Sequence, residues 1–440
     1  MFSSPVVSFF CLLLTIVTIV PKALAQTATD PFASITADAL KRHVVVLADD
    51  KLEGRNGGYP GELKAAQYIA NEFKKIGLVP MGDVSRGRRN YFQEFKFHPY
   101  HPVKPWQIMT SRNVLGFIEG SDQQLKNEIV VIGAHYDGQG RAGQSDPTRA
   151  PATDSDEIWN SANDNATSVA AILEIARAIK TGKIATKRSL LFIAFGAEEH
   201  GMTGSIYYVT HPAFELSRHV AMINLEKLGR SPERPLTVNG AASSPSWQKI
   251  LTAAQERTKT KVSINPFAFP DSDHYPFGAS RIPSIMFYVS TGADAHQASD
   301  SADKIDFARN AEAARHALAI ALEVANQPTR PEFAAAPFPD LGMIAHLATN
   351  AEADAVGLTG NASGLKVTGV LTGLPAATAG LIPGDLILKF NDFEFHRDHT
   401  LASLMAMHRQ ILEGKFGQQF RVILLRNGKQ SELKINLRQK

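Results

Sequence analysis

The sequence predicts an α/β fold, with a mostly parallel mixed sheet sandwiched by helices and a small β-rich domain after it. Three observations predict this. Short, dense apolar runs alternate with helix-like patterns over most of the chain. A proline-rich stretch then interrupts all periodicity, and the residues from 340 onward show short alternating strands around a Gly/Pro-rich centre. Strands that are apolar on both sides are typical of a sheet that helices cover on both faces.

The N-terminal segment, residues 1–25, predicts a signal peptide. An apolar run over residues 5–20 precedes the small-x-small triplet Ala23–Ala25, so we expect cleavage before Gln26. No Lys or Arg precedes the run, and the alternative is an uncleaved anchor, although the run is short for a membrane span. We therefore expect an exported protein, periplasmic or secreted, with no stable membrane span after cleavage.

Cysteine and charge content exclude several classes of function. The single cysteine, Cys11, lies in the predicted signal peptide. The mature protein would hold no thiol, which excludes cysteine catalysis, thiolate metal sites and disulfides. The net charge of +3, from 46 Lys+Arg and 43 Asp+Glu, is too small to indicate nucleic-acid binding. Any bound metal would have to be held by His, Asp and Glu.

Residues 26–327 predict the larger domain, in which strands and helices alternate. Helix-like patterns cover residues 61–77, 165–180 and 307–326. Four apolar runs predict buried strands over residues 128–134, 189–195, 220–225 and 283–289.

Acidic and histidine residues follow the ends of these four runs. They are His135 and Asp137 after the first, Glu198 and Glu199 after the second, Glu226 after the third and His296 after the fourth. Asp164 lies just before a helix pattern, where its simpler role is that of a helix cap. Ligands of an open α/β sheet bind outside the carboxyl ends of its strands, so we expect these side chains to converge. Clustered carboxylates resist ionisation unless a cation binds them, and His with carboxylate suits Zn²⁺, or else Mn²⁺ or Co²⁺.

Longer motifs carry a family resemblance. The segments LADDKLEGRNGGYPG, IVVIGAHYDG, NSANDNATSVAAILEIAR, KRSLLFIAFGAEEHGMTGS and SDSADKIDF occur in this order. With them, the chain from about residue 40 to about residue 307 resembles the zinc-dependent exopeptidases related to secreted bacterial leucyl aminopeptidases, glutamate carboxypeptidase and glutaminyl cyclase. The resemblance implies their di-zinc aminopeptidase fold and the metal-dependent hydrolysis of N-terminal amino acids from peptides.

The resemblance also implies a role for each site residue. The implied ligands are His135, Asp164 and Glu226 for one zinc ion and Asp164, Glu199 and His296 for the other, with Asp164 bridging the two. Glu198 would be the general base, which takes a proton from the attacking water and passes it to the leaving amine. Asp137 would orient the ring of His135 without itself binding the metal.

Position 226 departs from the family pattern, because most relatives carry Asp there. Glu226 has on the order of 1.5 Å more reach, which puts the affinity of the second metal in question. Lys227 follows directly and is expected to point to the opposite side of the strand.

Three alternatives to an aminopeptidase stay open. A carboxypeptidase would need a cationic group near the site, for which Arg141 and Arg281 are the candidates. A one-metal enzyme like glutaminyl cyclase is the second alternative. The third is an inactive peptidase-like binding protein, although such a chain should have lost a ligand or the base, and every position here carries a competent group.

The C-terminal part predicts a linker over residues 328–339 and a separate domain over residues 340–440. The segment GLKVTGVLTGLPAATAGLIPGDLILKFND resembles the core of a bacterial-type PDZ domain. The resemblance implies a carboxylate-binding loop at Leu341, Gly342 and Met343, whose N–H groups can bind the C-terminus of a peptide or partner protein. The alternative is a domain that packs on the larger one and binds nothing.

Overall fold

The computed structural model describes most of the chain. Described are residues 30–99, 107–144, 156–231, 233–266, 271–289, 294–334, 341–372, 374–398, 411 and 417–437. The predicted signal peptide and part of the predicted linker lie outside these ranges. Within them, no helix combines the length and the apolar composition that crossing a membrane requires.

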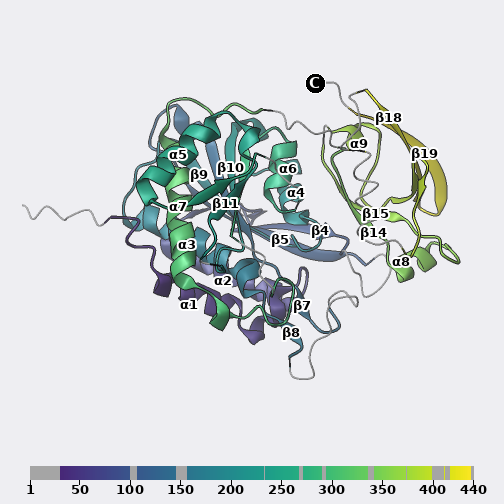
Figure 1. The fold of residues 1–440 in the computed structure, drawn as a ribbon, viewed down its shortest axis with the longest axis horizontal. Helices are drawn as coiled ribbons and strands as arrows, with labels where there is room; N and C mark the ends of the chain where they lie inside the picture. Colours follow the sequence, from purple (N-terminus) through teal and green to yellow (C-terminus); the bar gives the residue numbers. More distant parts are fainter. Residues whose placement is uncertain are drawn as a thin grey trace, which may run out of the picture.

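Nine strands of the described residues form one mixed sheet at the centre of the larger domain (Figure 1). In order across the sheet they are β1 (Val79–Pro80), β5 (Met109–Ile118), β9 (Ser189–Phe195), β6 (Ile129–His135), β10 (His219–Glu226), β13 (Ser284–Tyr288), β11 (Leu236–Asn239) and β12 (Val262–Ile264), while β4 (Phe92–Phe97) pairs with β5. The neighbours β9, β6, β10 and β13 run parallel, and β5 and β11 flank them in the antiparallel direction. These four parallel strands are the four apolar runs, so the predicted fold class is confirmed.

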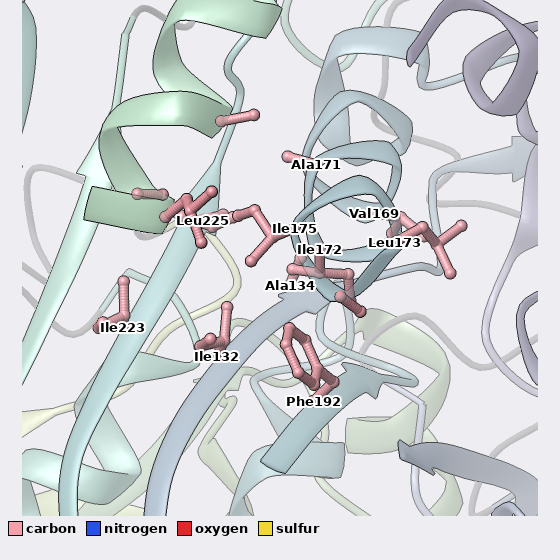
Figure 2. Packing of buried hydrophobic residues seen from close by; sticks show 14 of the residues in the cluster. Ile132, Ala134, Val169, Ala171, Ile172, Leu173, Ile175, Phe192, Ile223 and Leu225 are labelled. Carbon is pink, nitrogen blue, oxygen red and sulfur yellow. The ribbon is translucent and has the colours of Figure 1, made fainter. Parts of the chain in front are cut away.

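One face of the sheet packs against the longer helices. These are α1 (Ala37–Leu47), α2 (Pro60–Ile76), α3 (Thr167–Thr181), α5 (Ser246–Thr258) and α7 (Phe307–Asn326). Figure 2 shows Ile132, Phe192 and Leu225 of three neighbouring strands beside Ile172 and Ile175 of α3. All five side chains are buried, which explains why α3 must lie against the parallel centre of the sheet.

The opposite face is covered by shorter helices, α4 (Thr203–Thr210) and α6 (His274–Ala279). Val131 and Ile193 point to this side and pack with Ile206 of α4 and Phe277 of α6. Successive strand residues therefore pack on opposite faces, and both faces are apolar. Two short pairs complete the domain, β2 (Val84–Ser85) with β3 (Arg88–Arg89) and β7 (Gly140–Arg141) with β8 (Ile158–Trp159).

The C-terminal domain has an antiparallel sheet and its own core. Its strands, in sheet order, are β14 (Met343–Leu347), β15 (Leu365–Val370), β16 (Leu386–Phe390), β18 (Gln419–Arg426) and β19 (Lys429–Asn436), with β17 (Phe393–Glu394) paired to β16. Two short helices are α8 (Asn350–Ala355) and α9 (Pro375–Thr378). Val367, Phe390, Phe420 and Val422 are fully buried in its core.

The two domains touch at α4. Ile344 and Leu371 of the C-terminal domain belong to the same buried cluster as Met202 and Ile206, and Figure 1 shows the domain beside α4 and β4. The contact is close, because a Cβ added at Gly369 would lie 2.8 Å from the Cδ1 atom of Ile206. Packing on the larger domain, which the sequence left as an alternative to peptide recruitment, is thus observed, and it leaves recruitment open.

Candidate metal centre

The polar residues at the strand ends meet at the carboxyl edge of the parallel strands. His135 is the last residue of β6 and Glu226 the last residue of β10. Glu198 and Glu199 follow β9 after a short turn. Asp164 lies in the non-helical turn just before α3.

Two groups of three possible metal ligands share Asp164. One consists of His135, Asp164 and Glu226, and the other of Asp164, Glu199 and His296, with one ligand atom from each residue within 4.8 Å of the others in its group. The Nε2 atom of His135 is 3.3 Å from both Asp164 Oδ1 and Glu226 Oε1. The Nε2 atom of His296 is 3.0 Å from Asp164 Oδ2 and 3.6 Å from Glu199 Oε2. The structure therefore brings together the five residues that the sequence singled out as ligands.

The donor set fits a divalent cation. Both carboxylate oxygens of Asp164 and Oε1 of Glu199 are buried, and among the described residues none of the three accepts a well-aligned hydrogen bond, although His135, Lys227 and His296 form ion pairs with Asp164. Buried carboxylate oxygens without hydrogen bonds are costly unless a cation binds them. Two histidines and three carboxylates without thiolate suit Zn²⁺.

Asp164 is not a helix cap. The residue that precedes α3 as its cap is Ala166, and no side chain caps the helix end. Although burial disfavours ionisation, Lys227 and the two histidines hold the pKa of the Asp164 carboxyl well below its usual range. A carboxylate that stays charged in the interior is available as a metal ligand.

Glu198 lies beside the ligands but outside both groups. Its Oε2 atom is 3.8 Å from Nε2 of His135. Burial raises the pKa of the Glu198 carboxyl well above its usual value, and the nearby carboxylates of Asp273 and Glu199 add to the rise against the opposing effect of His135. A raised pKa is what a carboxylate needs in order to accept and release a proton near neutral pH.

Asp137 orients three site residues at once. Its fully buried carboxylate accepts hydrogen bonds from the backbone N–H groups of Glu198 (3.0 Å) and Glu199 (3.1 Å). The Oδ1 atom of Asp137 is also 3.5 Å from Nδ1 of His135, the ring nitrogen that faces away from Glu226. This carboxylate thus positions the glutamate pair as well as the histidine.

Asp300 and Arg55 were not singled out by sequence reasoning, yet both hold the site in place. The Asp300 carboxylate accepts the backbone N–H groups of Asn163 (3.0 Å) and Asp164 (3.1 Å). The fully buried guanidinium of Arg55 donates to the backbone oxygens of Tyr136 and Ser161, both at 2.8 Å. Both residues lie inside the motifs SDSADKIDF and LADDKLEGR, which were the signal available in the sequence.

Lys227 does not point away from the site, so that prediction was wrong. Its φ angle is 50°, which ends the alternation of the strand directly after Glu226. The Nζ atom consequently lies 2.6 Å from Glu226 Oε1 and 3.2 Å from Asp164 Oδ1. Glu226 Oε2 accepts hydrogen bonds from Ser272 Oγ (2.8 Å) and Asn165 Nδ2 (3.2 Å), which fix the carboxylate from the other side.

Comparison with known proteins places both domains in families. Residues 113–321 match the model described as peptidase family M28. The larger domain belongs to peptidase family M28. Residues 339–437 match the model of the PDZ domain, so the chain is an M28 peptidase domain with a C-terminal PDZ domain, and the resemblance seen in the sequence is confirmed.

Relatives and solved structures agree with this assignment. Aminopeptidase YwaD of Bacillus subtilis is 32% identical over 191 residues, which cover 42% of this chain and 37% of that protein. The chain thus spans little more than a third of that relative's length. The aminopeptidase structure from Aneurinibacillus sp. strain AM-1 covers 70% of this chain and 97% of its own with 19% identity and a TM-score of 0.53. The structure titled BSAP, a zinc aminopeptidase from Bacillus subtilis, covers 67% and 96% with 20% identity and a TM-score of 0.51. At these identities the two structures confirm the fold.

The residues expected in the PDZ loop lie at the start of its edge strand. Leu341 is buried, Gly342 has a φ angle of 67°, and Met343 begins β14. The backbone oxygens of Leu341 and Gly342 accept hydrogen bonds from the N–H groups of Ala376 and Leu371, both at 2.9 Å. Only glycine fits at position 342 for two reasons: its backbone is left-handed, and a Cβ there would lie 2.4 Å from the side chain of Leu374.

Proposed function

We propose that this M28 domain is a zinc-dependent aminopeptidase, which hydrolyses the N-terminal amino acid from peptides. The observation that carries the proposal is the pair of ligand groups that share Asp164, with Glu198 next to them. The aminopeptidase names of the relatives support it. Zinc bound by His135, Asp164, Glu199, Glu226 and His296 would supply the Lewis acid that activates water and polarises the scissile carbonyl.

Glu198 would carry the proton during hydrolysis. Its carboxylate is held on the turn that Asp137 fixes, within a few ångströms of His135. It would take a proton from the attacking water, whose oxygen bonds to the carbonyl carbon, and deliver that proton to the nitrogen of the leaving amine as the peptide C–N bond breaks. The products are the free amino acid and the shortened peptide.

The partners of the nearby cations favour a substrate with a free α-amine. Carboxylates predominate, and the described cations nearby are already engaged. Lys227 pairs with Glu226 and Asp164, and Arg230 pairs with Asp300 and Asp294. Arg281, a candidate for gripping a terminal carboxylate, instead lies over the ring of Phe333 at 5.2 Å. With these partners, Lys227, Arg230 and Arg281 are not placed to bind a terminal carboxylate, which favours a substrate that presents its α-amine.

Three forms of one short peptide distinguish the candidate activities. An aminopeptidase cleaves the unmodified and the C-terminally amidated peptide but not the N-acetylated one. A carboxypeptidase cleaves the unmodified and the N-acetylated peptide but not the amidated one. A peptide with N-terminal glutamine reports a cyclase by ammonia release without loss of a residue. No turnover of any form by zinc-loaded protein would contradict the enzyme proposal and favour a peptide-binding protein.

For the remainder of the chain we propose export through the signal peptide of residues 1–25 and domain limits of 26–327 and 340–440. The end of α7 at Asn326 and the PDZ match from residue 339 support these limits. A mature N-terminus at Gln26, read by sequencing the protein purified from a bacterial periplasm or medium, tests both the export and the cleavage site.

We further propose that the PDZ loop Leu341–Met343 binds the C-terminal carboxylate of long peptides. The position of Gly342 at the start of an edge strand supports this, since an extended peptide can pair with such an edge. A long peptide with a free C-terminus should then have a lower KM than its amidated twin, while kcat stays the same. Equal KM values would contradict recruitment and leave the domain with a packing role.

A further inference from the structure

The ammonium group of Lys227 lies inside one of the two ligand groups. It contacts Oε1 of Glu226 and Oδ1 of Asp164, at 2.6 and 3.2 Å. These are the two oxygens that face Nε2 of His135, each at 3.3 Å. The lysine therefore contacts the same carboxylate oxygens that a metal ion in the His135 group would need.

The backbone holds Lys227 in this position. Its N–H group donates to Asn165 Oδ1 at 3.0 Å, and the N–H groups of Leu228 and Gly229 donate to Thr167 Oγ1 (3.2 Å) and Asn163 Oδ1 (2.8 Å). The segment after β10 is thus tied to the segment that carries Asp164. The side chain of Lys227 is only 14% exposed, so its charge is directed to the carboxylates rather than to water.

In the other ligand group, Lys227 contacts only the shared Asp164, and it does so through Oδ1. Asp164 Oδ2 and Glu199 Oε2 face His296, and the ion pairs of Lys227 among the described residues are with Glu226 and Asp164 Oδ1. One Zn²⁺ in that group and the ammonium of Lys227 together carry three positive charges. This equals the charge of the three ligand carboxylates, Asp164, Glu199 and Glu226, so a second Zn²⁺ would exceed it.

Resting on the zinc-dependent function proposed above, we propose that Lys227 is an internal cation that competes with metal for the His135–Asp164–Glu226 group. The Asp164–Glu199–His296 group loads first. The second ion enters only at higher free zinc, when it displaces the ammonium from Glu226. Zinc concentration would then set whether the protein holds one metal or two.

Zinc stoichiometry tests this directly. The full chain is equilibrated over a series of buffered free zinc concentrations, and bound zinc per chain is measured by atomic emission. The wild type should show two separate binding steps. Lys227→Met keeps the length of the side chain and removes its charge, so its second step should move to about tenfold lower free zinc or further. Lys227→Arg should keep the wild-type separation.

Lys304→Met is the matched control. Its ammonium pairs with Asp294 at 2.8 Å and, among the described residues, forms no ion pair with either ligand group, so its removal should leave both binding steps in place. Two zinc ions bound with equal affinity by the wild type would overturn the role of Lys227, even if Lys227→Met failed to fold. An unchanged second step in folded Lys227→Met would do the same. A wild type that bound no zinc would instead contradict the proposed function.

Discussion

Replacing Asp137 by Asn tests how far the site depends on a residue that need not touch metal or substrate. The wild-type carboxylate accepts two backbone N–H groups, one from Glu198 and one from Glu199. The amide of Asn has nearly the same shape but only one oxygen. Its NH₂ group must therefore face one of the two N–H donors, which leaves that donor unpaired.

The structure gives the size of the effect. Losing one charge-assisted hydrogen bond and leaving a buried N–H unpaired costs about 2–3 kcal/mol in the free energy of unfolding. The turn that carries Glu198 and Glu199 would shift, and the contact of Asp137 with His135 Nδ1 would lose its charge. We expect about a 10–100-fold loss in zinc affinity or kcat/KM, as is usual when the partner of a metal-binding histidine is changed.

The assay pairs kcat/KM on an aminoacyl amide with zinc affinity from chelator competition. Asp385→Asn is the control, because Asp385 is equally buried and binds Arg426 and the N–H group of Ile382 in the PDZ domain. It should lower stability without changing zinc affinity. If Asp137→Asn kept both zinc affinity and kcat/KM within about twofold of wild type, the positioning role assigned to Asp137 would be refuted.

Three further predictions concern the base, the core and the domain contact. Glu198→Gln should keep zinc and lose turnover, whereas Glu199→Gln should lose zinc as well, so equal zinc content in the two variants would contradict the division of roles. Burial lowers the pKa of His316 to about 4, so this histidine stays neutral in the folded protein. The pH-dependent contribution of His316 to the free energy of unfolding, up to about 3 kcal/mol, is present in full above pH 6.5 and is lost as the pH falls toward 4. The stability difference between wild type and His316→Gln, from denaturant unfolding, should shrink over that range, and a constant difference would argue against it. Ile206→Ala should lower the free energy of unfolding by about 2 kcal/mol, because the Ile206 side chain packs against Gly369 of the PDZ domain. An unchanged melting temperature would show that the contact between the domains is not maintained.

The central strands and the convergence at their ends could be predicted from the sequence. A buried parallel strand is a continuous apolar run, and the residue that follows it must lie at the carboxyl edge of the sheet. His135 and Glu226 are the last residues of their strands, so their place follows from this rule alone.

The direction of Lys227 and the role of Asp300 could not be predicted in the same way. A left-handed φ angle in a non-glycine residue has no signal in a single sequence, and it reversed the expected side of Lys227. Asp300 binds the backbone of Asp164 and Asn163, which precede it in the sequence by 136 and 137 positions, and only the folded chain creates this contact. The position of the PDZ domain on α4 likewise depends on Ile206 and Ile344, which read as ordinary apolar residues in the sequence.

Zinc-dependent turnover of an aminoacyl amide tests the central claim most directly. The purified chain is stripped with a chelator, and release of p-nitroaniline from leucine p-nitroanilide and related amides is followed as zinc is added back. Stripped protein should be inactive, and activity should return with bound zinc in the wild type but not in Glu198→Gln. Full activity of the stripped protein, or no turnover of any amide by the zinc-loaded wild type, would contradict a metal-dependent aminopeptidase.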